Sequence, residues 1–464
     1  MPENTVSEPL VCCRCDAGRL ETTAEELRCV ACDSTYPILG EIPCLVPDPA
    51  IYRHGWHARV GAYVTAIEER LREISLEREA DELPRRTRER LLRVLGALHT
   101  QRRAVETLMA PMLANVGQTP LAALSSHPAF AANSDAAAPL AVLQHYENIF
   151  RDWAWGQEEN DRQRDMLQRL IPSSMQEIHR IAIYGSGAGR LAVDLHQHLL
   201  PKHTFGLDLN PLPLIVGDQL LRGTSLSLPE FPLAPRAEEK VVVLHQLTSP
   251  LIRPGVTFMF ADALRPPFAA GSLDVVVTPW FIDVVDVDLG TTAAAINRVL
   301  RRGGLWLNLG PLMFKGSVGN QHAIEEVLDI VRDSGFELLS NGSEDVPYYR
   351  SPHSGSSRVE TVFWYSARKI KETPVRERRA PVGTVDPAGG NTEPPWLSDP
   401  NLPVPLQPQL AQVHRSSVMT IGVLSMIDGQ RSITDMAARL AQSWNAEPSA
   451  VRDHLRAFFM TFFK

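Results

Sequence analysis

Short apolar runs bounded by turn residues dominate the centre of the chain. They cover residues 181–184, 205–210, 256–263 and 272–278. Runs of this length and composition are typical of buried strands. A helix-like segment follows the first run as far as Leu199, and a further apolar run begins near Gly303. Strand and helix therefore alternate, which predicts an α/β fold with a doubly wound sheet.

Apolar positions recur at helical intervals on both sides of this region. Between residues 56 and 115 they are Ile67, Leu71, Ile74, Leu91, Leu92, Leu95 and Leu98, separated by many Arg and Glu residues. Residues 140–171 and 419–463 have a similar spacing. This pattern predicts amphipathic helices in all three stretches. A proline-rich insertion of undecided role occupies residues 211–255.

Composition narrows the range of partners. The formal net charge of −8, from 46 basic and 54 acidic residues, creates no sequence-wide field for phosphate backbones, so nucleic acid is not expected. The start of the chain lacks the basic and apolar regions of a secretory signal, and no apolar run approaches the ~18 residues needed to cross a bilayer. We therefore expect a cytoplasmic protein without a membrane partner.

All six cysteines lie before residue 45, and four of them form two C-x2-C pairs. The pairs are Cys12 with Cys15 and Cys29 with Cys32, separated by thirteen residues. Four thiolates in this spacing can bind zinc tetrahedrally with no open position, so a structural zinc ribbon is predicted. A cysteine-bearing fold without metal is the alternative. Cys44 stands among apolar residues and is expected to be a small buried hydrophobe.

A glycine-rich turn follows the first predicted strand. Gly185 and Gly187 allow backbone conformations and a close ligand approach that a Cβ would block, while Gly189 lets the following helix pack near the strand. Asp208 ends the second strand and is suited to two ribose hydroxyls. Asp262 ends the third strand, where it could hold an adenine amine. This order favours S-adenosyl-L-methionine over a dinucleotide.

Five segments carry a resemblance to a known family. They are RDWAWGQEEN from Arg151, YGSGAGRLA from Tyr184, TPWFIDVV from Thr278, GGLWLNLGPLMF from Gly303 and VFWYSARK from Val362. Together they resemble the class I S-adenosylmethionine-dependent methyltransferases and, within them, the carnosine N-methyltransferase-like family. The stretch YPILGEIP at residues 36–43 resembles the Trm112-type zinc-ribbon module that accompanies some methyltransferases.

The resemblance implies a site at the carboxyl ends of the strands. The cofactor contacts would be Trp153, Gly185, Ser186, Gly187, Gly189, Arg190, Asp208, Asp262, Ala263 and Thr278. The acceptor would contact Trp280, Phe281, Asn308, Phe314 and Tyr349. Trp153 is also compatible with simple core packing, and Arg190 with an ion pair.

Asp283, Lys315 and Tyr348 are the candidate catalytic residues. Asp283 could accept the ring N–H of an imidazole acceptor opposite the attacking nitrogen, which fixes the neutral tautomer. Its alternative role is to cap the following helix. Lys315 stands where carnosine-methylating relatives carry a histidine, so carnosine itself is in doubt.

The predicted units are a zinc ribbon at 1–50, a helical segment at 51–140, the methyltransferase domain at 141–370, a proline-rich linker at 371–415 and a small helical domain at 416–464. The predicted activity is methyl transfer to nitrogen in a small molecule or peptide, such as an imidazole. One alternative is an oxygen or carbon acceptor. Another is a noncatalytic scaffold that contacts a protein partner through the zinc ribbon or the C-terminal helices.

Overall fold

The structure is a computed structural model that describes most of the chain. The described residues are 9–16, 18–23, 25–114, 140–175, 177–249, 255–285, 287–314, 318–373, 432–444, 447–449 and 451–452. They belong to two compact units, one ending at Arg378 and one beginning at Arg379. Among these residues, no helix combines the length and apolar character needed to cross a membrane.

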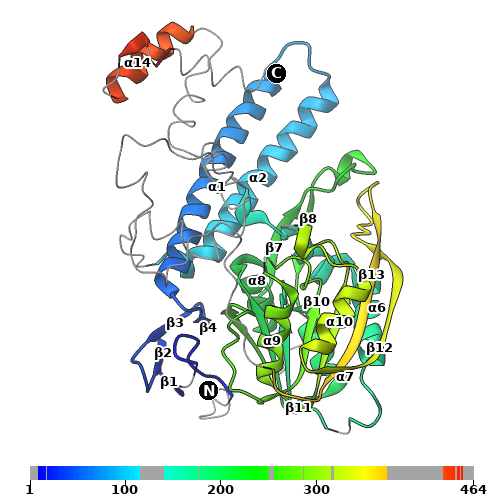
Figure 1. The fold of residues 1–464 in the computed structure, drawn as a ribbon. Coiled ribbons are helices and arrows are strands. Elements are labelled where there is room, and N and C mark those ends of the chain that lie inside the picture. The colour runs from blue at the N-terminus through cyan, green and yellow to red at the C-terminus, as the bar shows by residue number, and fades with distance from the viewer. Residues whose placement is uncertain are drawn as a thin grey trace. The chain divides into compact units, whose positions relative to one another are not determined.

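An eleven-stranded sheet organises the first unit (Figure 1). Its central strands are parallel and lie in the order β9 (Val256–Ala261), β6 (His203–Asp208), β5 (Arg180–Tyr184), β10 (Leu273–Pro279) and β11 (Leu300–Gly310). Two antiparallel strands, β13 (Arg358–Lys369) and β12 (Phe336–Tyr348), complete one edge. The predicted α/β fold is confirmed.

Helices cover both faces of this sheet. Alternate residues of each central strand therefore point into two separate hydrophobic cores. Ile181 and Ile183 of β5 join the core that includes α7 (Arg190–Leu199) and α8 (Pro211–Leu221). Ala182 and Tyr184 join the core that includes α9 (Leu289–Val299) and α10 (Ile324–Asp333). Two buried faces explain why the strands read as nearly continuous apolar runs.

The predicted insertion at 211–255 begins with a buried helix. Pro211 occupies the first turn of α8, where proline costs no hydrogen bond. A two-stranded hairpin follows, formed by β7 (Leu226–Glu230) and β8 (Val243–Leu247). The first part of the insertion therefore belongs to the core, and the hairpin forms a separate two-stranded sheet.

The N-terminal strands continue the central sheet. Strands β1 (Leu20–Thr22), β2 (Glu26–Cys29), β3 (Thr35–Leu39) and β4 (Ile42–Leu45) pair in antiparallel order. Strand β4 then pairs in parallel with β9, with Cys44 opposite Phe260. Cys44 is fully buried at this junction, as its apolar neighbours predicted.

Two long helices, α1 (Pro49–Arg78) and α2 (Arg85–Leu113), pack against each other. Seven buried α1 side chains recur at helical spacing: Tyr52, Trp56, Val60, Tyr63, Ile67, Leu71 and Ile74. Leu91 and Leu95 of α2 are buried as predicted, whereas Leu92 is 56% exposed. One residue turns a helix by about 100°, so Leu92 leaves the buried stripe.

The helix predicted over residues 140–171 is interrupted. It consists of η2 (Ala141–Leu143), α5 (Tyr146–Phe150), a π-helical turn η3 (Arg151–Trp155) and α6 (Gln157–Arg169). At Gly156 a Cβ would lie 2.2 Å from the Arg151 carbonyl oxygen, so only glycine fits where the wide turn closes. Such turns are frequent at functional sites.

Of the second unit, the structure describes α14 (Ile433–Trp444) and a few residues near it. The predicted helical character of this region is thereby confirmed for one helix. Apart from residues 371–373, the predicted linker lies outside the described residues.

Candidate functional site

The glycine turn lies directly after β5, and its three glycines differ in what surrounds them. All have positive φ, at +69° for Gly185, +55° for Gly187 and +80° for Gly189. A Cβ on Gly189 would lie 2.2 Å from Phe258, and one on Gly185 would lie 2.9 Å from Phe281. A Cβ on Gly187 would meet nothing within 4 Å. Gly187 therefore faces open space, and a ligand can approach its backbone.

Two carboxylates follow the neighbouring strands at the same edge of the sheet. Asp208, at the end of β6, accepts hydrogen bonds from the backbone N–H groups of Gly187 and Asn210, each at 2.8 Å. Burial raises the pKa of Asp208, and these two donors oppose the shift. Asp262 follows β9 and accepts from the Leu264 N–H at 2.9 Å. The predicted ribose residue thus contacts the glycine turn, and the predicted adenine residue follows the next strand of the sheet.

Two buried polar atoms near Gly185 have no hydrogen-bond partner among the residues that the structure describes. They are the Ser186 hydroxyl oxygen and the Trp280 indole nitrogen. Leaving such a group unsatisfied costs about 1–3 kcal/mol. A polar ligand bound at this edge could satisfy these atoms, so they fit the predicted cofactor cradle.

Trp153 and Arg190 connect the π-helical turn to the glycine turn. The Trp153 indole N–H donates to the Ala188 carbonyl oxygen at 2.9 Å. Arg190 pairs with Asp194, with Nε 2.9 Å from Oδ1, and donates to the Asp152 carbonyl oxygen at 3.0 Å. Arg190 therefore forms an ion pair, but the pair is largely buried and not at the surface as considered. A direct contact of either side chain with the cofactor remains a prediction.

Trp280 lies in a strained conformation beside this edge. Its φ of +52° is uncommon for any residue except glycine and is typical of functional sites. Gly310 makes room for it, because a Cβ there would lie 2.9 Å from the Trp280 Cα. The Trp280 ring stacks on Tyr348, with centroids 4.2 Å apart and planes at 23°. Two predicted site residues from distant segments are thus brought together.

Asp283 lies where the WFID segment meets the loop after β11. Its side chain is only 2% exposed, and it accepts a hydrogen bond from the Met313 N–H at 3.1 Å. Phe281 lies beside Tyr184, with ring centroids 6.0 Å apart. Phe314 lies beside His322, with ring centroids 5.3 Å apart. Lys315 lies outside the described residues.

Thr278 and Asn308 are fully buried and bond to each other. The Thr278 hydroxyl donates to Asn308 Oδ1 at 2.9 Å and accepts from the Trp306 indole N–H at 2.9 Å. Asn308 donates to the Phe363 carbonyl oxygen at 3.3 Å. These side chains are satisfied inside the protein, so their predicted ligand contacts would have to come from the backbone. Ala263, 7% exposed, also packs in the core.

Buried charges that the sequence analysis missed hold the residues 348–350 in place. Arg151 and Asp152 form a buried ion pair, with Nη2 2.7 Å from Oδ1. Arg151 also donates to the Tyr348 hydroxyl at 3.1 Å. Glu159 accepts from the N–H groups of Tyr349 and Arg350 at 3.3 and 2.7 Å. The sequence offered one sign of these ion pairs, because charged residues stand here at positions that a helical pattern places on the buried side, and buried charges are nearly always paired.

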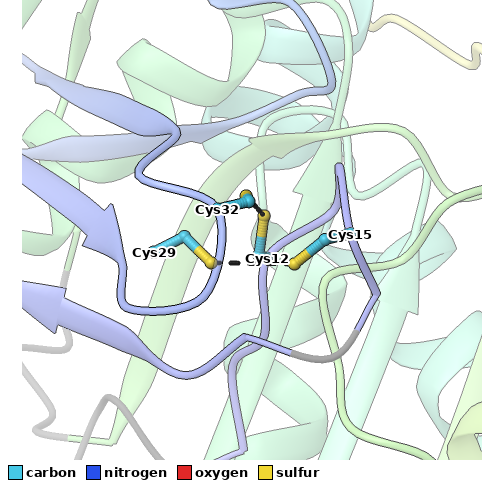
Figure 2. A group of neighbouring side chains, drawn as sticks. All are labelled: Cys12, Cys15, Cys29 and Cys32. Atoms are coloured by element: carbon cyan, nitrogen blue, oxygen red, sulfur yellow. Dashed lines mark hydrogen bonds between the residues drawn. The ribbon is translucent and has the colours of Figure 1, made fainter.

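The four predicted zinc ligands converge in the N-terminal module (Figure 2). Cys12 Sγ lies 3.6 Å from Cys32 Sγ, and Cys15 Sγ lies 3.7 Å from Cys29 Sγ. All four sulfur atoms lie within 4.8 Å of one another. Sulfur atoms bound tetrahedrally at about 2.3 Å from zinc are separated by ~3.8 Å. The cluster therefore fits a four-sulfur zinc site.

The backbone around the cluster is also arranged for thiolates. The N–H groups of Arg14 and Ala31 each donate to a cysteine sulfur, Cys12 and Cys29 respectively, at 3.4 Å. Such outer hydrogen bonds orient metal ligands. A Cβ on Gly18 would lie 2.1 Å from Cys29 Sγ, so glycine is required where the chain passes the cluster.

Two family models match the central part of the chain. Residues 256–369 match the model described as carnosine N-methyltransferase, and residues 183–307 match a methyltransferase domain. A carnosine N-methyltransferase from Dictyostelium discoideum is 26% identical over 193 residues, which cover 36% of this chain and 40% of that protein. The chain thus aligns with less than half the length of this relative.

Solved structures that resemble the chain include an S-adenosylmethionine-dependent methyltransferase from Mesorhizobium loti. The two proteins are 14% identical, the match covers 44% of this chain and 96% of that chain, and the TM-score is 0.30. Another is a complex of the Haloferax volcanii Trm112 methyltransferase activator with a methyltransferase, with 14% identity, coverage of 50% and 97%, and a TM-score of 0.34. The methyltransferase model and the strand order together identify the central part of this chain as a class I methyltransferase domain, and this part is similar in sequence to carnosine N-methyltransferases.

Proposed function

We propose that the protein transfers a methyl group from S-adenosyl-L-methionine to a nitrogen atom, such as an imidazole nitrogen, of a small molecule or peptide. The observation that carries this proposal is the open face of Gly187 beside the Asp208 carboxylate. The strained Trp280 lies at the same edge of the sheet, next to Phe281, which contacts Gly185. The residues predicted for the cofactor and for the acceptor thus support this proposal by lying at one edge of the sheet.

The cofactor would be held by groups whose geometry suits its separate parts. Asp208 would accept hydrogen bonds from the ribose hydroxyls, and Asp262 would accept one from the adenine amine. The glycine turn offers its backbone and the Ser186 hydroxyl to the amino-acid end. When bound, S-adenosyl-L-methionine would supply a sulfonium methyl group: the acceptor nitrogen forms a bond to the methyl carbon in line with the C–S bond, which breaks and releases S-adenosylhomocysteine. Residues of this site need only position the acceptor and exclude water.

Asp283 would orient the acceptor. Because Asp283 is almost fully buried, its carboxylate is shielded from water and interacts strongly with a bound N–H. An imidazole that donates one ring N–H to Asp283 presents its other nitrogen, with a lone pair, to the methyl group. The positive charge that develops on the ring during methylation is then stabilised by the same carboxylate. Tyr348 covers one face of the Trp280 ring, so the opposite face of Trp280 would contact a flat or cationic group.

The zinc ribbon would have a structural role in this protein. Four cysteine ligands leave zinc no open position for chemistry. Strand β4 of this module pairs with β9 of the methyltransferase sheet, close to the strand end that carries Asp262. We therefore propose that zinc stabilises this edge of the sheet.

Cofactor binding is tested by calorimetry with S-adenosyl-L-methionine. We expect Asp208→Ala to weaken binding about 10- to 100-fold, because a charge-assisted hydrogen bond contributes about 1.5–3 kcal/mol. Asp333→Ala, which removes an exposed carboxylate at the end of α10, serves as the control. Equal affinities for wild type and Asp208→Ala would contradict the cofactor site. Failure of the wild type to bind at all would favour a noncatalytic scaffold.

Acceptor chemistry is tested with labelled cofactor and a panel of imidazole-containing dipeptides, with carnosine included. Mass spectrometry should locate the new methyl group on a ring nitrogen. We expect Asp283→Asn to lower kcat/KM for that acceptor by about 10²-fold or more, while cofactor affinity stays unchanged. A cell extract serves as the second substrate source. A methyl ester or a carbon-bound methyl group as the product would reject the nitrogen acceptor.

A further inference from the structure

Glu230, His245 and His353 form a second group of side chains that could bind a metal ion. One potential ligand atom from each lies within 4.8 Å of the other two. Glu230 and His245 come from the hairpin β7 and β8, and His353 comes from the loop after β12. None of these residues belongs to the cofactor or acceptor site described above.

The hairpin register places two of the ligands on one face. Leu228 pairs with His245 across the hairpin, so Glu230, two residues further along β7, lies diagonally from His245 on the same side. His245 Nε2 lies 2.6 Å from Glu230 Oε2. The side chains of Glu230 and His245 are 8% and 12% exposed. A carboxylate and an imidazole are thus held together and largely shielded from water.

Backbone hydrogen bonds bring His353 to this pair. The Arg236 N–H donates to the His353 carbonyl oxygen at 3.1 Å, and the Gly355 N–H donates to the Ala234 carbonyl oxygen at 2.7 Å. His353 therefore does not depend on a metal to reach the cluster. Its ring centroid lies 5.6 Å from that of His245.

The carboxylate is oriented by further donors. The Ser351 hydroxyl donates to Glu230 Oε1 at 3.0 Å, and the Trp155 indole N–H donates to Oε2 at 3.2 Å. Outer partners of this kind accompany metal-binding carboxylates and fix their geometry. An ordinary ion pair between His245 and Glu230 would explain their close contact. It would not explain why a third ligand and two orienting donors converge on the same carboxylate.

We propose that Glu230, His245 and His353 bind a divalent first-row transition metal, and that zinc occupies the site. Two imidazoles and one carboxylate are a ligand set that zinc accepts at about 2.0–2.2 Å, with one position left for water. Zinc would replace the direct contact between His245 Nε2 and Glu230 Oε2. The metal would fasten the β7–β8 hairpin to the loop that carries His353, which follows Tyr348 and Tyr349 in sequence.

The test is equilibrium dialysis of the full chain against buffered zinc, followed by measurement of bound zinc. We expect wild type to hold about one zinc ion per chain more than His353→Gln or Glu230→Gln. His179→Gln, which changes a surface histidine outside the cluster, should hold as much zinc as wild type. The cysteines are intact in all four proteins, so zinc bound by the ribbon cancels from the difference.

Equal zinc in wild type and both cluster variants would overturn the proposal. Cobalt provides a second measurement, because the cluster has no thiolate. Cobalt bound there should add weak visible absorption without the near-ultraviolet charge-transfer band of a thiolate site, and His353→Gln should lose only that component. Loss of the thiolate band in His353→Gln, with no other change, would also contradict the proposal. These measurements involve no methyl transfer, so their failure leaves the proposed activity untouched.

Discussion

The central sheet and the N-terminal module share one continuous sheet but are stabilised in different ways. The central parallel strands bury apolar side chains on both faces against packed helices. Strands β1 to β4 have three to five residues each, and four cysteines converge beside them. Such a small segment buries little apolar surface of its own, so a bound metal is the expected source of its stability.

Removal of one zinc ligand should have the largest effect. Structural zinc contributes about 10–16 kcal/mol to small sites, so Cys29→Ser should release the metal and unfold the module. Hydrogen exchange should show loss of protection in β2 and β3, with β5 and β6 still protected. Cys44→Ala, which changes a buried cysteine outside the cluster, should retain zinc. If the β2 and β3 amides stay protected in zinc-free Cys29→Ser, the N-terminal module does not depend on zinc for its stability, and this prediction is wrong.

Packing in the central sheet is tested at Gly189. An added Cβ would meet Phe258 at 2.2 Å in a backbone of positive φ, so Gly189→Ala should destabilise the protein by about 2–5 kcal/mol. Urea unfolding measures this change, and bound zinc should stay constant. Gly61→Ala in α1 is the matched control, because its Cβ would meet nothing within 4 Å. We expect that change to be neutral or to stabilise by up to about 1 kcal/mol.

A substitution at Gly187 distinguishes the effect of packing on stability from the effect of ligand binding, at the same turn as Gly189. Because Gly187 faces open space, Gly187→Ala should cost only the strain of its positive φ, about 1–2 kcal/mol. Its Cβ would occupy space expected for the cofactor, so affinity for S-adenosyl-L-methionine should fall at least about tenfold, or ~1.4 kcal/mol. A variant that binds the cofactor like wild type would place the ligand elsewhere.

The smallest expected effect is a pH dependence of cofactor binding. Burial raises the pKa of Asp208 above its ordinary value, so its carboxylate becomes protonated at a higher pH than that of an exposed aspartate. The ionised form is the better acceptor for ribose hydroxyls. Affinity should therefore be highest above this raised pKa and fall as the pH drops through it. Calorimetry across acidic pH should show that Asp208→Asn lacks this step.

Local spacing allowed the sequence to predict several parts of the site. The C-x2-C pairs and the glycine turn are readable because their function depends on residues within a few positions of one another. The strand ends at Asp208 and Asp262 were also readable, since apolar runs stop there. The roles of these residues toward cofactor and acceptor remain predictions, and Lys315 lies outside the described residues.

Contacts between distant segments were decided only by the tertiary structure. Nothing near Trp280 in the chain indicates that it stacks on Tyr348, or that β4 pairs with β9. The same holds for Glu230, His245 and His353, whose meeting depends on a hairpin register and a loop more than 100 positions away. Apolar periodicity specifies which face of an element is buried. The partner that covers this face depends on packing of the whole chain.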